Sequence, residues 1–121
     1  MATILLVEDT PANRALATKL LRAAGHEVLS AETAADGIAL ARERLPDLVL
    51  MDLGLPDMDG WQALSELRRD DGAVAGLRIV AFTAHAMVGD KDRAMAAGFD
   101  GYLSKPIDFA SFADTVGGLL P

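Results

Sequence analysis

The chain has 121 residues, which suits one domain able to bury roughly two thirds of the surface that its unfolded form exposes. It has no cysteine, which excludes disulfides, thiolate metal sites and cysteine nucleophiles. Its net charge of −7 argues against direct binding to DNA or to anionic membranes, and without a signal-peptide pattern or a long apolar run we expect a cytoplasmic protein.

Short apolar segments alternate along the chain with longer segments in which apolar residues recur at helical spacing. The expected strands cover residues 3–7, 27–30, 47–52, 77–82 and 101–103. Of the expected helices, the first begins at Pro11 and ends before Gly25, and the second lies between Thr33 and Pro46. The other three cover about 61–69, 87–97 and 109–120, and Gly89 inside the fourth would weaken that helix.

This alternation predicts an α/β fold, a flavodoxin-like (βα)5 three-layer sandwich that forms a single domain over residues 1–121. Strands that are apolar on both faces and are each followed by a helix indicate a parallel sheet covered on both sides. Right-handed crossover connections leave few topologies for five such strands, and the strand order 2-1-3-4-5 is the one expected.

Reactive side chains follow four of the five expected strands. Glu8 and Asp9 follow the first, Asp52 ends the third, Thr83 follows the fourth, and Lys105 comes shortly after the fifth. The carboxyl ends of parallel strands meet at one edge of the sheet, where ligands bind in this kind of fold. Because the first and third strands are expected to be neighbours, the three carboxylates should converge, with a hydroxyl and an ammonium group beside them.

Converging carboxylates need a neutralising cation, since each pair repels by about 1 kcal/mol in water and by several-fold more at lower effective dielectric. Magnesium prefers a few carboxylate ligands and keeps several waters. A carboxylate can also attack phosphorus to give an aspartyl phosphate, and phosphoryl transfer uses a metal and a lysine to neutralise the phosphoryl oxygens. The residues therefore indicate Asp52 as nucleophile, Glu8 and Asp9 as metal-holding residues, and Lys105 as the cation.

Four stretches resemble the receiver domains of two-component signalling, and the resemblance covers residues 3–120. They are Val7-Glu8-Asp9, the run at 51–60 (Met-Asp-Leu-Gly-Leu-Pro-Asp-Met-Asp-Gly), Thr83-Ala84, and the run at 98–106 (Gly-Phe-Asp-Gly-Tyr-Leu-Ser-Lys-Pro). Each is weak alone, but together, in this order and spacing, they are very specific. The runs at 83–87 and 104–107 are also similar to stand-alone regulators of the DivK kind, and receivers of hybrid kinases share them.

The resemblance implies a phosphorylated signalling switch rather than an enzyme with turnover. Asp52 would accept a phosphoryl group from a histidine kinase or a histidine phosphotransfer protein, and the domain would later release it by autodephosphorylation. Asp9 and Asp52 would bind Mg²⁺ directly, or Mn²⁺ in its place. Glu8 would act through water, and the backbone carbonyl of Gly54 would be the third protein ligand.

The resemblance also implies how the signal leaves the site. The backbones of Leu53 and Ala84 would contact the phosphoryl group, and Lys105 would pair with it. Thr83 would move its hydroxyl onto the phosphoryl group and Tyr102 would change rotamer, remodelling the surface of the last two helices and the fifth strand for a downstream protein target. Two further features concern the same region: a cis peptide would join Lys105 to Pro106, and Gly54 and His85 would tune the reaction rates.

Less specific roles compete with these assignments. Asp9 could simply cap the first helix, Thr83 could be a strand residue favoured for its β-branched side chain, and Tyr102 could be a half-buried aromatic residue. Asp57 and Asp59 look like additional metal ligands, but turn and N-cap chemistry explains both better.

Other function classes fit the sequence less well. A flavodoxin-like cofactor carrier would need a phosphate-binding loop after the first strand, and a nucleotide enzyme would need a glycine-rich motif; neither is present. A haloacid-dehalogenase-type phosphatase also uses magnesium and an aspartyl nucleophile, but on its first strand, and continuous turnover would distinguish it. The chain could be a stand-alone regulator or a receiver excised from a hybrid kinase or a larger regulator; Met1, shortly before the first strand, favours the former.

Overall fold

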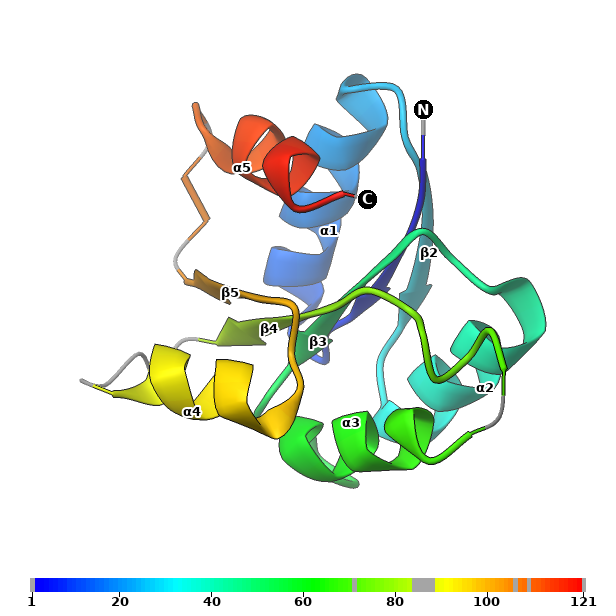
Figure 1. Ribbon diagram of the computed structural model, residues 1–121. Helices are drawn as coiled ribbons and strands as arrows, with labels where there is room; N and C mark the ends of the chain where they lie inside the picture. The colour runs from blue at the N-terminus through cyan, green and yellow to red at the C-terminus, as the bar shows by residue number, and fades with distance from the viewer. Residues whose placement is uncertain (1, 71, 84–88, 106, 109, 121) are drawn as a thin grey trace.

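The computed structural model describes residues 2–70, 72–83, 89–105, 107–108 and 110–120 (Figure 1). The strands are β1 (Thr3–Val7), β2 (Glu27–Ala31), β3 (Leu48–Asp52), β4 (Ile79–Thr83) and β5 (Gly101–Ser104). The helices are α1 (Pro11–Ala23), α2 (Ala34–Arg44), α3 (Gly60–Arg68), α4 (Asp90–Ala97) and α5 (Phe112–Leu119). The regular alternation of strand and helix expected from the sequence is confirmed.

The five strands form one parallel sheet in the order β2-β1-β3-β4-β5, as predicted for a flavodoxin-like fold. Figure 1 shows α1 and α5 on one face of the sheet and α2, α3 and α4 on the other. β1 and β3 lie side by side, so the residues that follow them reach the same edge of the sheet. Within the part of the chain that is described, no helix is both long enough and apolar enough to cross a membrane.

The core consists of two apolar layers, one on each face of the sheet, because successive strand residues point to opposite faces. On the face of α1 and α5, the central strands contribute Ile4, Leu6, Leu48, Leu50, Val80 and Phe82. On the face of α2, α3 and α4, they contribute Leu5, Val7, Val49, Met51, Ile79 and Ala81. All of these side chains are buried, which explains why the central strands read as unbroken apolar runs.

Two predicted boundaries near the fourth helix are wrong. The fourth strand begins at Ile79 rather than at residue 77 and includes Thr83. The helix after it begins at Asp90, and Gly89 is its N-cap residue with φ of 88°, rather than a residue inside the helix. Glycine adopts this left-handed backbone conformation without steric cost, so Gly89 helps to start α4 instead of weakening it.

Candidate functional site

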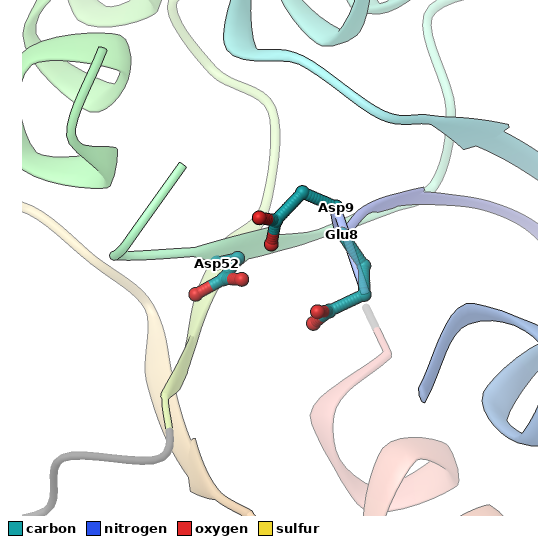
Figure 2. Close-up of side chains that lie close together, drawn as sticks. All are labelled: Glu8, Asp9 and Asp52. Carbon is teal, nitrogen blue, oxygen red and sulfur yellow. The ribbon is translucent and has the colours of Figure 1, made fainter. Parts of the chain in front are cut away.

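Three carboxylates meet at the carboxyl edge of the sheet (Figure 2). Glu8, Asp9 and Asp52 each offer a carboxylate oxygen, and these oxygens all lie within 4.8 Å of one another. Glu8 is completely buried, Asp52 is buried and Asp9 is half-buried. The predicted convergence is therefore present, and this acidic cluster could hold a hard cation such as Mg²⁺, which prefers carboxylate oxygens.

The sheet explains why these side chains meet. Val7 and Met51 are register partners in β1 and β3, so Glu8 and Asp52 both follow directly at the end of the paired segment. Alternation along β3 places Asp52 on the same face as Leu48 and Leu50, the face that α1 and α5 cover. The acidic cluster therefore lies at the end of this apolar layer, with Glu8 and Asp52 buried and Asp9 half-buried.

Lys105 is the cation of the site. Its Nζ atom lies 2.5 Å from Glu8 Oε2 and 3.2 Å from Asp52 Oδ2, and also 4.9 Å from the centre of the Phe82 ring. The contact with Glu8 is a close charge pair rather than a directed hydrogen bond, because Oε2 has no partner in hydrogen-bond geometry among the described residues. One lysine balances one of three carboxylates, so the site keeps an excess of negative charge that suits a divalent cation.

Two hydrogen bonds from the segment after β1 hold Glu8 in place, one to its side chain and one to its backbone. The backbone N–H of Thr10 donates to Glu8 Oε1 at 3.2 Å, and Arg14 Nη1 donates to the Glu8 carbonyl oxygen at 2.9 Å. Thr10, and not Asp9, is the N-cap residue of α1. The alternative in which Asp9 only caps this helix is therefore not favoured, since its carboxylate belongs to the acidic cluster.

The loop after Asp52 is packed closely against that residue. The N–H of Gly54 donates to Asp52 Oδ1 at 3.0 Å, and the N–H of Gly60 donates to the carbonyl oxygen of Leu53 at 3.1 Å. A Cβ atom at position 60 would lie 2.6 Å from the backbone oxygen of Asp52, so only glycine lets α3 begin this near to it. An added Cβ on Gly54 would lie 3.9 Å from Asp52 Oδ1, an ordinary contact.

Thr83 and Tyr102 lie on the two strands beyond β3. Thr83 ends β4, is buried, and is the register partner of Ser104; its carbonyl oxygen accepts the N–H of Lys105 at 2.8 Å. Tyr102 lies in β5 and packs against the apolar layer of α2, α3 and α4. Its buried hydroxyl has no hydrogen-bond partner among the described residues. Burial, and to a smaller extent Asp90, raises the pKa of this phenol.

Three residues of the predicted site lie outside the described residues. They are Ala84 and His85, which follow β4, and Pro106, which follows Lys105.

Asp57 and Asp59 make helix-capping hydrogen bonds, in line with the turn and N-cap interpretation. Asp59 is the N-cap residue of α3, and its Oδ1 accepts the N–H of Gln62 at 2.8 Å. Asp57 instead accepts the N–H groups of Ala34 and Ala35, at the start of α2, at 2.9 and 3.0 Å. Sequence reasoning missed this contact, because no local pattern links residues 23 positions apart.

A second missed arrangement joins α3 to α4. Trp61, the only tryptophan in the chain, packs edge-on against Phe99 with ring centroids 5.5 Å apart. The guanidinium carbon of Arg93 lies 5.1 Å from the centre of the Trp61 ring. Arg93 of α4 thus contacts Trp61 of α3, and this arrangement involves no residue of the acidic cluster.

The sequence and the structure were compared with known proteins. The model of the response regulator receiver domain matches residues 4–116. The chain belongs to the response regulator receiver domain family. Its fold is thus that of a receiver domain of two-component signalling, a family of signalling switches.

Individual relatives agree with this assignment. The receiver domain is 37% identical over 120 residues to protein PilH of Pseudomonas aeruginosa, covering 99% of this chain and 98% of PilH. It is 36% identical over 114 residues to the polar-differentiation response regulator DivK of Brucella anthropi, covering 94% of this chain and 92% of DivK. The structure of the chemotaxis response regulator CheY4 of Vibrio cholerae superposes with a TM-score of 0.90 at 26% identity, covering 99% of both chains.

Proposed function

We propose that Asp52 is the phosphoacceptor of this receiver domain. The observation that carries the proposal is the meeting of Asp52 with Glu8, Asp9 and Lys105 at the carboxyl edge of the sheet. One carboxylate oxygen of Asp52 faces the Lys105 ammonium group, and the other accepts the N–H of Gly54. Both interactions fix the orientation of the carboxylate, as an in-line attack on phosphorus requires.

The acidic cluster would hold the magnesium ion. Asp9 and Asp52 would supply carboxylate oxygens, the backbone carbonyl of Gly54 would supply a third protein ligand, and Glu8 would act through a water molecule. When bound, the ion would supply positive charge that neutralises the phosphoryl oxygens. Mn²⁺ has the same preference for oxygen ligands and should replace Mg²⁺.

Asp52 then takes the phosphoryl group from a phosphohistidine on a histidine kinase or a histidine phosphotransfer protein. A carboxylate oxygen of Asp52 forms the new bond to phosphorus, the phosphorus–nitrogen bond breaks, and the histidine ring, protonated on its other nitrogen, leaves as neutral imidazole. The ammonium group of Lys105 would then pair with one phosphoryl oxygen. The backbones of Leu53 and Ala84 would bind the other phosphoryl oxygens. Attack by water on phosphorus later releases inorganic phosphate and restores the Asp52 carboxylate, which is the autodephosphorylation expected of this switch.

Thr83 and Tyr102 transmit the change to the α4–β5–α5 surface. Thr83 would turn its hydroxyl toward the phosphoryl group, and Tyr102 would change rotamer in response. The buried hydroxyl of Tyr102, which has no hydrogen-bond partner within the described part of the chain, supports this role, because an unsatisfied polar group favours a conformation in which it finds a partner. Within α4, Ala94 is the buried residue, so a small energy can move the helix.

The partner that reads this surface would be a protein rather than DNA, in keeping with the acidic net charge of −7. The match covers 92% of the response regulator DivK and 98% of PilH, and a stand-alone role through protein contacts is proposed here by analogy with them. A cytoplasmic location stays a prediction, as does the organisation of the chain as a single domain.

The proposal is tested by incubating the protein with acetyl phosphate and MgCl₂ and measuring its intact mass. We expect the mass of one added phosphoryl group, lost in Asp52→Asn and in the presence of a chelator. Lys105→Ala should lose both the phosphorylation and the conformational change, because it removes the charged partner of the phosphoryl group. A phosphoryl group located on serine, threonine or histidine would overturn the assignment, and continuous hydrolysis of acetyl phosphate at high rate would favour a phosphatase.

A further inference from the structure

The Asp57 carboxylate joins the loop after β3 to a helix that is distant in the sequence. Oδ1 accepts the N–H of Ala34 at 2.9 Å, and Oδ2 accepts the N–H of Ala35 at 3.0 Å. Both oxygens of one side chain are thus bound to the first turn of α2. These backbone hydrogen bonds lower the pKa of Asp57, so the side chain is ionised at neutral pH and its charge complements the positive end of the helix.

The same loop carries the backbone groups that the site would use. Residues 53–59 connect Asp52 to α3, and hydrogen bonds hold the loop near both of its ends. At the beginning, Gly54 donates to Asp52; at the end, Gly60 donates to Leu53. Asp57 lies between these two points and connects the loop to α2, the helix that packs on β1.

Asp57 is an additional cap of α2, because the helix also has an N-cap residue next to it in the chain. Thr33 is the N-cap residue of this helix, and its hydroxyl accepts the N–H of Asp36 at 3.2 Å. α2 is also fixed close to β1, because a Cβ atom at Gly37 would lie 2.6 Å from a methyl carbon of Val7. The first turn of α2 is therefore fixed in position. The hydrogen bonds between Asp57 and this turn can in consequence determine where the loop after β3 lies.

We propose that Asp57 is a positioning residue for the phosphorylation site. By tying the loop to α2, it fixes where the backbone of Leu53 and Gly54 lies relative to Asp52. The inference rests on the proposed function, in which the Gly54 carbonyl binds the metal and the Leu53 backbone binds the phosphoryl group. Without Asp57, the loop should sample positions in which these backbone groups no longer converge with the carboxylates.

The experiment compares Asp57→Ala with a matched control, Thr33→Ala. Both substitutions remove a hydrogen-bond acceptor from the first turn of α2, but only the first releases the loop. Asp57→Asn serves as the conservative variant, because its single carbonyl oxygen can still accept one of the two N–H groups. Amide-resolved NMR spectra of the metal-free proteins, followed by titration with MgCl₂ below the melting temperature of each variant, give two independent readouts.

We expect Asp57→Ala to shift the amide signals of Leu53 and Gly54 in the metal-free protein and to raise the dissociation constant for Mg²⁺ about tenfold, as changes around metal ligands commonly do. Asp57→Asn should recover part of both effects. Thr33→Ala should leave both readouts at the wild-type values although it also lowers the melting temperature.

The inference is overturned if Asp57→Ala leaves the Leu53 and Gly54 signals unchanged, or if Thr33→Ala produces the same loss of Mg²⁺ affinity. In the latter case Asp57 would act only by stabilising α2. If the wild-type protein binds no Mg²⁺, the proposed function fails instead, and the metal-free spectra still decide whether Asp57 positions the loop.

Discussion

Replacing Asp52 by asparagine should remove function and yet stabilise the metal-free protein. The substitution keeps the size of the side chain and the Oδ1 atom that accepts the N–H of Gly54, so packing should change little. It removes one of three negative charges whose oxygens lie within 4.8 Å of one another. Sites that concentrate like charge for function are commonly less stable than a neutral version of the same site.

The distances give the expected size of the effect. At an effective dielectric constant of about 20, two unit charges no more than 4.8 Å apart repel by at least about 3.5 kcal/mol, so Glu8 and Asp9 together repel Asp52 by at least about 7 kcal/mol. Lys105 Nζ, 3.2 Å away, attracts Asp52 by about 5 kcal/mol on the same basis. The remaining repulsion of at least about 2 kcal/mol should disappear in Asp52→Asn, which for a domain of this size raises the melting temperature by about 5–10 °C or more.

Thermal melts of both proteins with and without Mg²⁺, at fixed ionic strength, measure this effect. Mg²⁺ at about ten times its dissociation constant should stabilise the wild type by about 1.4 kcal/mol through mass action, and the variant by less. If Asp52→Asn melts several degrees below the wild type without metal, the attraction to Lys105 outweighs the repulsion. If the wild type in addition ignores Mg²⁺, the three carboxylates do not form a metal site.

Three further predictions concern signalling, α4 and pH. Thr83→Ala should still be phosphorylated at Asp52, but beryllofluoride should no longer shift the amide signals of α4, β5 and α5; a normal shift would refute the division of roles. Arg93→Ala should change the fluorescence emission of Trp61 and speed amide exchange in α4, because it removes a cation–π contact worth about 0.5–1 kcal/mol at an exposed site; unchanged emission would contradict this. The pKa of Asp57 is lower in the folded protein than its ordinary value of 3.8, so its contribution to stability should be fully present above that pH and be lost as pH falls below it. Acid unfolding of Asp57→Asn should lack this component, and identical pH profiles would argue against it.

The sequence alone was sufficient for those features that depend on neighbouring residues. Each central strand is an apolar run that ends at a polar residue, as in Thr3–Val7 followed by Glu8. This pattern predicted both the sheet and the edge of the sheet at which the carboxylates meet. The Asp59 cap of α3 spans three residues and is readable from the sequence in the same way. The motifs that resemble receiver domains indicate the family to which the chain belongs.

Only the tertiary structure decided how residues from different elements pair. Lys105 lies closer to Glu8 than to Asp52, Asp57 binds the first turn of α2, and Arg93 stacks on Trp61. No periodicity or local motif encodes these pairs, because each depends on the distance between two elements. That distance is set by how tightly helices pack on the sheet. A helix can approach β1 as α2 does only where a glycine such as Gly37 leaves room, and the position of its first turn then determines which loop side chain can reach it.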